Sequence, residues 1–208
     1  MMRVKVCGIT NLEDAKLCYE LGADALGFIF YERSKRNIDF EDALAIINEL
    51  PAFVSKVGVF VNEQADTINH IAQSIGLTHV QLHGNEDQNL ISKVNHPVIK
   101  ALRVKDNFNF TSLESFSGCT ILLDTFSDKE IGGTGLTFDW NTIPMDLRSK
   151  VILAGGVSAL NIESICKTIK PQAVDISSSL ESESGKKDKT KVREFFRVLN
   201  QLRKTELE

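Results

Sequence analysis

Short apolar runs alternate with stretches of helical periodicity along the whole chain. The runs are rich in β-branched residues, which is typical of buried strands. They cover residues 4–7, 25–30, 56–61, 79–82, 98–102, 120–124, 151–154 and 173–176. The stretches between them repeat apolar residues at spacings of three and four, which indicates amphipathic helices. The pattern therefore predicts eight strand–helix units that follow one another without a linker.

The last stretch is the clearest predicted helix, with an apolar stripe at Val192, Phe195, Phe196, Leu199 and Leu202. Four further stripes lie within residues 12–21, 43–50, 68–75 and 160–169, the last of them beginning at Leu160. Suitable capping residues flank several of these stretches. The predicted N-caps are Asn11, Asp39 and Asp188, and the predicted C-terminal stops are Gly22 and Gly76.

Strands that are apolar throughout and joined by helices indicate a parallel sheet covered by helices. Eight such units close into a (β/α)8 barrel, or TIM barrel, for which about 200 residues is the lower limit. The alternative is a doubly wound open sheet, which carries a glycine-rich phosphate turn after its first strand. That position here holds Cys7-Gly8-Ile9-Thr10. We therefore favour an α/β fold in which residues 1–208 form a single barrel domain of near-minimal length.

Composition narrows the class of protein. The chain is 42% hydrophobic and 25% charged, as ordinary soluble globular proteins are. A net charge of -4 offers no broad basic face, so nucleic acid is not an expected partner. The chain has no apolar stretch near the ~20 residues of a membrane span, and its first strand begins too early for a signal peptide. Four well-separated cysteines suggest free thiols in a reducing cytoplasm.

Polar and glycine residues gather directly after the predicted strands. In a barrel all of these positions share one rim, which is where barrel active sites are built. They are Cys7-Gly8, Ser34-Lys35-Arg36, Gln81-Leu82-His83-Gly84, Asp124, Ile131-Gly132-Gly133-Thr134-Gly135, Gly155-Gly156 and Asp175-Ile176-Ser177-Ser178. The arrangement favours an enzyme.

Gly155-Gly156 and Ser177-Ser178 follow the seventh and eighth strands, the usual phosphate-binding position of this barrel class. Glycines let backbone N–H groups approach an anion closely. Each pair alone could be an ordinary tight turn, but the two together favour phosphate.

Cys7 and Asp124 end the first and sixth strands. Alternation along a strand places Lys5 with Cys7, and Leu122 with Asp124, on one face each. If both faces point inward, a thiol and a carboxylate meet across the barrel mouth as an acid–base pair. Taken singly, the thiol could be a structural core residue and the carboxylate a cap.

The remaining polar residues leave several interpretations open. The four histidines lack metal-ligand spacing, so no metal is expected, and only His83 lies at the rim. Arg36 could clamp a carboxylate or be solvated. The basic run at residues 186–189 is most simply a solvated face. Lys5 or Lys100 could form a Schiff base, although ion-paired lysines are commoner.

Together these motifs resemble phosphoribosylanthranilate isomerase of tryptophan biosynthesis over essentially the whole chain. The matching segments include Lys5-Val6-Cys7-Gly8-Ile9-Thr10, Val80-Gln81-Leu82-His83-Gly84, Gly132-Gly133-Thr134-Gly135, Leu153-Ala154-Gly155-Gly156 with Asn161, and Val174-Asp175-Ile176-Ser177-Ser178 with Glu181 and Gly185-Lys186-Lys187-Asp188. This resemblance implies a TIM-barrel isomerase that acts on a small phosphorylated substrate without a cofactor, as a monomer or homodimer.

The resemblance also implies roles for individual residues. Asp124 would protonate the ribose ring oxygen, and Cys7 as thiolate would remove the C2 proton of an Amadori rearrangement. A modest downward shift of the Cys7 pKa would suit this role. The candidate substrate-binding set is Arg36, Gln81, His83, Gly133, Thr134, Gly135, Gly155, Gly156, Asp175, Ser177 and Ser178. The alternatives are a Schiff-base phosphate-binding barrel and a non-catalytic phosphate binder.

Four positions depart from the family's usual residues. Ser179 replaces a common Gly, which would tolerate left-handed backbone better, and Ser184 replaces a common Pro. Asn37 and Ile38 stand where an aromatic residue is frequent.

Overall fold

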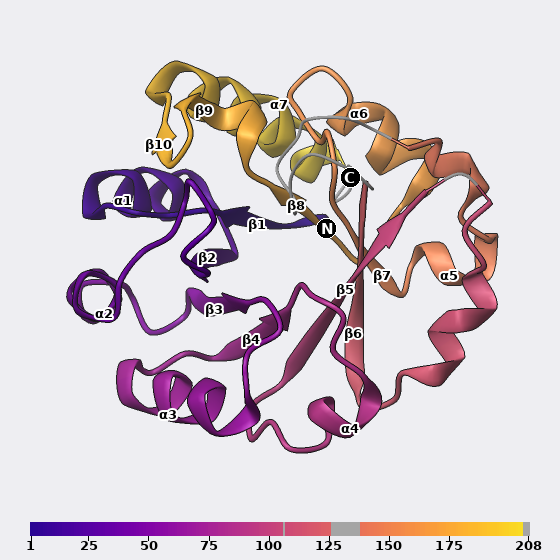
Figure 1. Ribbon diagram of the computed structural model, residues 1–208. Coiled ribbons are helices and arrows are strands. Elements are labelled where there is room, and N and C mark those ends of the chain that lie inside the picture. Colours follow the sequence, from indigo (N-terminus) through magenta and orange to yellow (C-terminus); the bar gives the residue numbers. More distant parts are fainter. Residues whose placement is uncertain (106, 126–137, 206–208) are drawn as a thin grey trace.

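Eight parallel strands form a closed barrel in chain order, with helices around it (Figure 1). The computed structural model describes residues 1–105, 107–125 and 138–205. The strands are β1 (Arg3–Cys7), β2 (Ala25–Phe30), β3 (Ser55–Phe60), β4 (His79–Leu82), β5 (Val98–Val104), β6 (Cys119–Thr125), β7 (Val151–Leu153) and β8 (Ala173–Ile176). The predicted barrel is confirmed, and its strands differ from the predicted ranges by no more than two residues at either end.

The helices surround the barrel, and α7 packs against both α1 and α6. The helices are α1 (Leu12–Leu21), α2 (Phe40–Asn48), α3 (Ala65–Ile75), α4 (Gln88–Ile91), α5 (Met145–Arg148), α6 (Ile162–Ser164) and α7 (Lys189–Thr205). Among the described residues, no helix combines the length and apolarity that crossing a membrane requires.

The predicted caps are confirmed. Asn11 and Asp39 accept hydrogen bonds from backbone N–H groups in the first turns of α1 and α2, and Asp188 does the same for α7. Gly22 and Gly76 end α1 and α3 with left-handed backbone, at φ values of 112° and 72°. Side chains avoid this conformation, so glycine is the favoured residue at both stops.

Between β5 and β8 the described helices are shorter than α1, α2 and α3. In the described part of the β5–β6 connection, the helical segment is the 3-10 helix Phe110–Ser115. This region is rich in Ser, Thr, Asn and Phe, which are weaker helix formers than Ala or Leu. The apolar stripe predicted from Leu160 is wrong at its first member. Leu160 lies in the turn before α6 and is 98% exposed, whereas the π-helical segment Ile165–Ile169 continues the buried face.

The strand residues alternate between two apolar regions. Most apolar side chains pack between the sheet and the helices. A smaller cluster fills the barrel interior and consists of Val57, Ile99, Ala101, Leu122, Ile152 and Ala154. A Cβ atom built on Gly27 of β2 would lie 2.8 Å from Cys7 Sγ and 3.1 Å from Lys5 Cε. Lys5 and Cys7 therefore share the inner face, as predicted, and the close approach requires glycine at position 27.

A small antiparallel hairpin between β8 and α7 was not predicted. It consists of β9 (Glu181–Glu183) and β10 (Lys186–Lys187), and it lies beside α1 and the end of β1 (Figure 1). The prediction that residues 186–189 form a solvated face is wrong at one position. The Lys186 side chain is exposed, but that of Lys187 is completely buried, because its ammonium group reaches a carboxylate under the hairpin.

Candidate active site

A cavity opens at the carboxyl ends of the barrel strands. It is lined by all ten predicted site residues within the described part of the chain: Cys7, Arg36, Gln81, His83, Asp124, Gly155, Gly156, Asp175, Ser177 and Ser178. The predicted residues Gly133, Thr134 and Gly135 lie outside the described residues. The strand topology therefore brings together side chains that are up to 171 positions apart in sequence (Cys7 and Ser178).

An apolar wall of the cavity was missed from the sequence. Ile29 lies on the inner face of β2 and Val59 on that of β3. Tyr31 and Val61, just after these strands, continue the same alternation, and all four residues line the cavity. Continuing the period-2 alternation past the ends of these strands would have found them. They provide a surface suited to a flat apolar group.

Cys7 is buried at the end of β1, next to an ion pair inside the barrel. The Lys5 ammonium donates to Asp175 Oδ2 at 2.8 Å, and it also interacts with the Cys7 thiol. Burial raises the pKa of Cys7 above its ordinary value of 9.0, and the Lys5 charge offsets only part of this effect. The downward shift that would suit a general base is therefore not found in the free enzyme, because the buried thiolate loses its hydration.

Asp124 is held at the opposite side of the mouth. Its Oδ1 accepts a hydrogen bond from the Thr125 backbone N–H at 2.8 Å. Its Oδ2 lies 3.3 Å from His83 Nε2, a close contact without good hydrogen-bond alignment. The Gln81 amide nitrogen lies 2.9 Å from His83 Nδ1. Since that amide donates, the neutral His83 ring carries its proton on Nε2, facing Asp124.

The glycine pair after β7 adopts left-handed backbone, with φ values of 80° at Gly155 and 72° at Gly156. A Cβ on Gly155 would lie 2.2 Å from Thr125 Oγ1, so a side chain at this position would collide. The Asn161 side chain stabilises the turn, because its Nδ2 donates a hydrogen bond to the Gly156 carbonyl at 2.9 Å. This glycine pair leaves its backbone open to a ligand in the cavity.

The segment after β8 continues the same wall. Ser177 Oγ donates to the Cys7 carbonyl at 3.0 Å. Ser179, which stands where a glycine is common, is not among the residues with positive φ, and its hydroxyl donates to the Val157 carbonyl at 2.5 Å. The serine therefore fits the turn without backbone strain.

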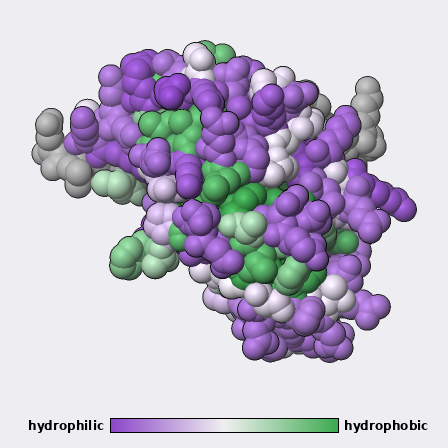
Figure 2. Space-filling model, turned by 90° about the vertical axis from the view of Figure 1, so that its left-hand side faces the viewer, coloured by the Kyte–Doolittle hydropathy of each residue, from purple (hydrophilic) through white to green (hydrophobic). Residues whose placement is uncertain are grey.

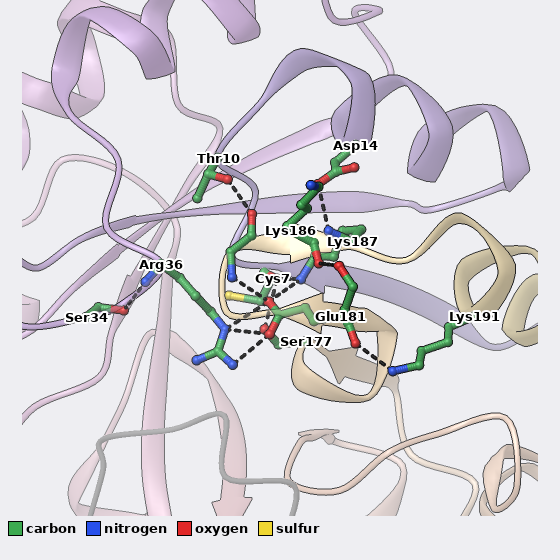
Figure 3. A network of polar contacts seen from close by, with 12 residues as sticks. Cys7, Thr10, Asp14, Ser34, Arg36, Ser177, Glu181, Lys186, Lys187 and Lys191 are labelled. Atoms are coloured by element: carbon green, nitrogen blue, oxygen red, sulfur yellow. Dashed lines mark hydrogen bonds and ion pairs between the residues drawn. The ribbon is translucent and has the colours of Figure 1, made fainter.

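Arg36 is buried and ion-paired rather than solvated. Its Nε and Nη2 donate to the two carboxylate oxygens of Glu181, at 2.9 and 2.7 Å (Figure 3). Arg36 also lines the cavity beside Cys7. The arrangement holds a guanidinium group at the mouth in a fixed plane.

The geometry is that of a closed eight-stranded barrel with a thiol, a carboxyl group and a glycine turn around one cavity at its mouth. The family model for N-(5'-phosphoribosyl)anthranilate isomerase matches residues 4–198. The chain belongs to this family.

Individual members of the family are similar along their whole length. The N-(5'-phosphoribosyl)anthranilate isomerase of Pelobacter propionicus is 45% identical over 98% of both chains. The solved phosphoribosylanthranilate isomerase of Thermotoga maritima is 42% identical with a TM-score of 0.89, covering 97% of this chain and 100% of the other. A solved family member in complex with reduced 1-(o-carboxyphenylamino)-1-deoxyribulose 5-phosphate is 41% identical with a TM-score of 0.86, at the same coverage.

The lysines that could have formed a Schiff base do not suit that role. A Schiff base needs a neutral amine. Burial alone would lower the pKa of Lys5, but Asp175 and Cys7 outweigh it and hold the pKa above 10.5. Lys100 donates to Glu86 at 2.6 Å and to the Gly84 carbonyl at 2.8 Å, and it does not line the cavity. Lys5 is therefore held as an ammonium ion beside Asp175, and Lys100 is held away from the cavity by Glu86.

Proposed function

We propose that residues 1–208 act as one catalytic domain that isomerises N-(5'-phosphoribosyl)anthranilate to 1-(2-carboxyphenylamino)-1-deoxyribulose 5-phosphate. As a family member, the chain is an aldose–ketose isomerase of tryptophan biosynthesis. The observation that carries the proposal is the placement of Cys7 and Asp124. Both lie on the inner face at strand ends and line one cavity.

The first step assigns Asp124 as the general acid. Its carboxyl group donates a proton to the ribose ring oxygen as the bond from that oxygen to C1 breaks. The anthranilate nitrogen supplies its lone pair to C1, which gives an open-chain iminium ion and a free C4 hydroxyl group. His83 contacts the Asp124 carboxylate that remains, so it is placed to stabilise the new negative charge.

The second step assigns Cys7 as the general base. Its thiolate removes the proton from C2, and the electron pair of that bond moves toward the iminium nitrogen to form an enolamine. Tautomerisation of the enolamine, with a proton added at C1 and one lost from the C2 hydroxyl, gives the ketone. Lys5 lies beside the thiol and favours its charged form. The two side chains thus supply the acid and the base of the rearrangement.

Binding is assigned to two ends of the cavity. The backbone of Gly155-Gly156 and Ser177-Ser178 would hold the phosphate, together with the segment Gly133–Gly135. The apolar wall would hold the anthranilate ring, with Arg36 toward its carboxylate. Asp175 Oδ1 is buried and has no hydrogen-bond partner among the described residues, so it is available to a substrate hydroxyl group. Gln81 would act through His83.

The decisive experiment follows the loss of substrate fluorescence with wild type, Cys7→Ser and Asp124→Asn. Each substitution keeps the size of the side chain and removes its acid–base function. We expect turnover in the wild type and a loss of about 10²–10⁴-fold in each variant. Circular dichroism and urea unfolding serve as folding controls. Wild-type activity in either variant would remove that residue from the mechanism.

We further propose that the enzyme works in the cytoplasm as a homodimer. The described cysteines are free thiols, which suits a reducing compartment. A solved structure of monomers derived from the dimeric enzyme of Thermotoga maritima is 39% identical with a TM-score of 0.84, covering 96% of this chain and 99% of the other. Small anionic metabolites are the expected ligands of the cavity.

A further inference from the structure

We propose that Glu181 and Lys187 of the β9–β10 hairpin are positioning residues for the isomerisation, Glu181 through Arg36 and Lys187 through Cys7. Figure 3 shows the network: the hairpin lies over the end of β1, and its two charged side chains point inward toward Arg36 and the Cys7 backbone. This inference rests on the proposed function, because it assigns Arg36 to the anthranilate carboxylate and Cys7 to proton abstraction.

Glu181 controls the plane of the Arg36 guanidinium. The two side chains are 4% and 9% exposed, and two N–H groups of Arg36 meet two oxygens of the carboxylate. A two-point contact fixes rotation as well as distance, which a single hydrogen bond does not. The Arg36 backbone N–H also donates to Ser34 Oγ at 3.1 Å. The guanidinium therefore has one orientation at the cavity wall.

Lys187 controls the backbone of Cys7. Its completely buried ammonium donates to the Cys7 carbonyl at 2.7 Å and to Glu181 Oε1 at 2.9 Å. Ser177 donates to the same carbonyl. Two donors on one carbonyl oxygen restrict the peptide that follows the thiol-bearing residue. The position of Sγ relative to the substrate thus depends on Lys187.

Further hydrogen bonds hold the β9–β10 hairpin in place against its neighbours. The Lys187 backbone N–H donates to Asp14 Oδ2 at 2.8 Å, and Thr10 Oγ1 contacts the Gly185 carbonyl. Lys191 Nζ donates to the Glu181 carbonyl at 2.6 Å. The network is anchored in α1, α7 and the loop after β1, so it forms a rigid support at the rim.

The location of the network favours function over simple stabilisation. Burying two cations around one carboxylate carries a desolvation cost that well-packed apolar residues would avoid. The network lies at the carboxyl rim, where barrels place their chemistry, and not at the opposite face that mainly stabilises the fold. Its contacts toward the cavity are made with the Arg36 side chain, which is assigned to the substrate, and with the backbone carbonyl of Cys7, the proposed base.

The Glu181 arm is tested by separating KM from kcat. In Glu181→Gln the side chain keeps its size but loses its charge and one of its two acceptor oxygens for Arg36. We expect KM to rise about tenfold or more, with kcat within about threefold of wild type. Glu183→Gln, in the same strand with an exposed side chain, is the matched control and should leave both constants unchanged.

A double-variant cycle decides whether Glu181 acts through Arg36. If it does, KM of Arg36→Met/Glu181→Gln equals that of Arg36→Met within about twofold. Multiplied effects, or a wild-type KM in Glu181→Gln, would overturn this arm. If Glu181→Gln does not fold, Glu181→Asp, which keeps the charge but withdraws the carboxylate, enters the same cycle. An inactive wild type would instead overturn the proposed function.

For the role of Lys187 we expect the opposite result: an effect on kcat and not on KM. Lys187→Met should lower kcat about tenfold or more with KM within about threefold, because it disturbs the base and not the ligand. Lys187→Arg keeps the charge and the donors and should recover most of kcat. Lys186→Met, next in sequence but exposed, is the control. A wild-type kcat in Lys187→Met, or a loss confined to KM, would overturn this arm. If Lys187→Met does not fold, Lys187→Gln takes its place and is judged by the same criteria, with Lys187→Arg again expected to recover most of kcat.

Discussion

The ionisation of Cys7 is governed by opposing effects within a few ångströms. Burial removes water from the thiolate and raises the pKa of the thiol, while the Lys5 ammonium lowers it and the Asp175 carboxylate raises it again. The free enzyme therefore holds less thiolate at neutral pH than an exposed cysteine would. The thiol could be identified from the sequence, but the direction of its pKa shift could not, because that direction depends on the depth of the side chain in the barrel.

This arrangement predicts how the ionisation of Cys7 depends on pH. Because burial raises the pKa of Cys7, the rate at which an alkylating reagent modifies this thiol should still be rising at the pH where an exposed cysteine is already ionised. Lys5→Met removes the charge that offsets burial, so its alkylation profile should move to still higher pH. Mass spectrometry of the Cys7 peptide after alkylation between about pH 6 and 10 measures both profiles.

The control for this profile is Cys18→Ser, since Cys18 is buried away from the cavity and burial raises its pKa to about 12. That variant should reproduce the wild-type profile. A wild-type alkylation rate of Cys7 that levels off near neutral pH would contradict a raised pKa for this thiol.

At the scale of single elements, the turn after β7 shows how strongly one position can be constrained. Gly155 combines a left-handed backbone with a near-collision at Thr125, whereas Gly76 has the same kind of backbone but open space where a side chain would lie. Substituting these two glycines therefore distinguishes the free-energy cost of a strained backbone from the additional cost of a steric clash.

We expect Gly76→Ala to lower the free energy of unfolding by about 1–2 kcal/mol, from backbone strain alone. Gly155→Ala should lose about 1–3 kcal/mol more, because the methyl group overpacks the turn, and its KM should rise as the phosphate end is displaced. Urea unfolding and steady-state kinetics measure these effects. Equal stabilities in the two variants would show that the turn relaxes around the methyl group.

Strands and long helices could be predicted because their residues carry the periodic pattern themselves. The hairpin β9–β10 could not, since two-residue and three-residue strands of charged residues have no apolar alternation. Its burial comes from hydrogen bonds of its side chains with Cys7 and Arg36 and of its backbone with Asp14, all at least 145 positions earlier. Local composition therefore described Lys187 as solvated when its long-range partners bury it.

Most of the candidate site, like the strands and long helices, could be predicted from the sequence. Strand order places the loops that follow the strands on one rim, so ten candidate residues were found from the sequence. The apolar wall at Ile29 and Val59 was missed because valine and isoleucine in a strand are usually core residues. Their role depends on where the barrel interior opens, which strand prediction does not give.

At the scale of the whole molecule, exposed apolar side chains are candidates for the interface of the proposed homodimer. Phe53, which follows α2, is fully exposed, and Figure 2 shows apolar surface amid hydrophilic surface on the side of the molecule that carries α1 and α2. If the chain forms the proposed homodimer, burying Phe53 would contribute to the interface.

We expect sedimentation equilibrium to give a dimer for the wild type and a shift toward monomer for Phe53→Asp, because an aspartate cannot be buried there without a partner. Glu49→Gln, at an exposed position just after α2, serves as the control. A wild type that stays monomeric at high concentration would contradict the homodimer, and an unchanged dimer in Phe53→Asp would exclude Phe53 from its interface.

The hairpin contact also affects when the enzyme becomes competent during synthesis. Lys187, which donates to the Cys7 carbonyl, is 180 positions later in the chain. During synthesis the thiol is therefore made long before the residue that supports it. Catalytic competence should arise only after β10 has been made and has folded back onto the end of β1.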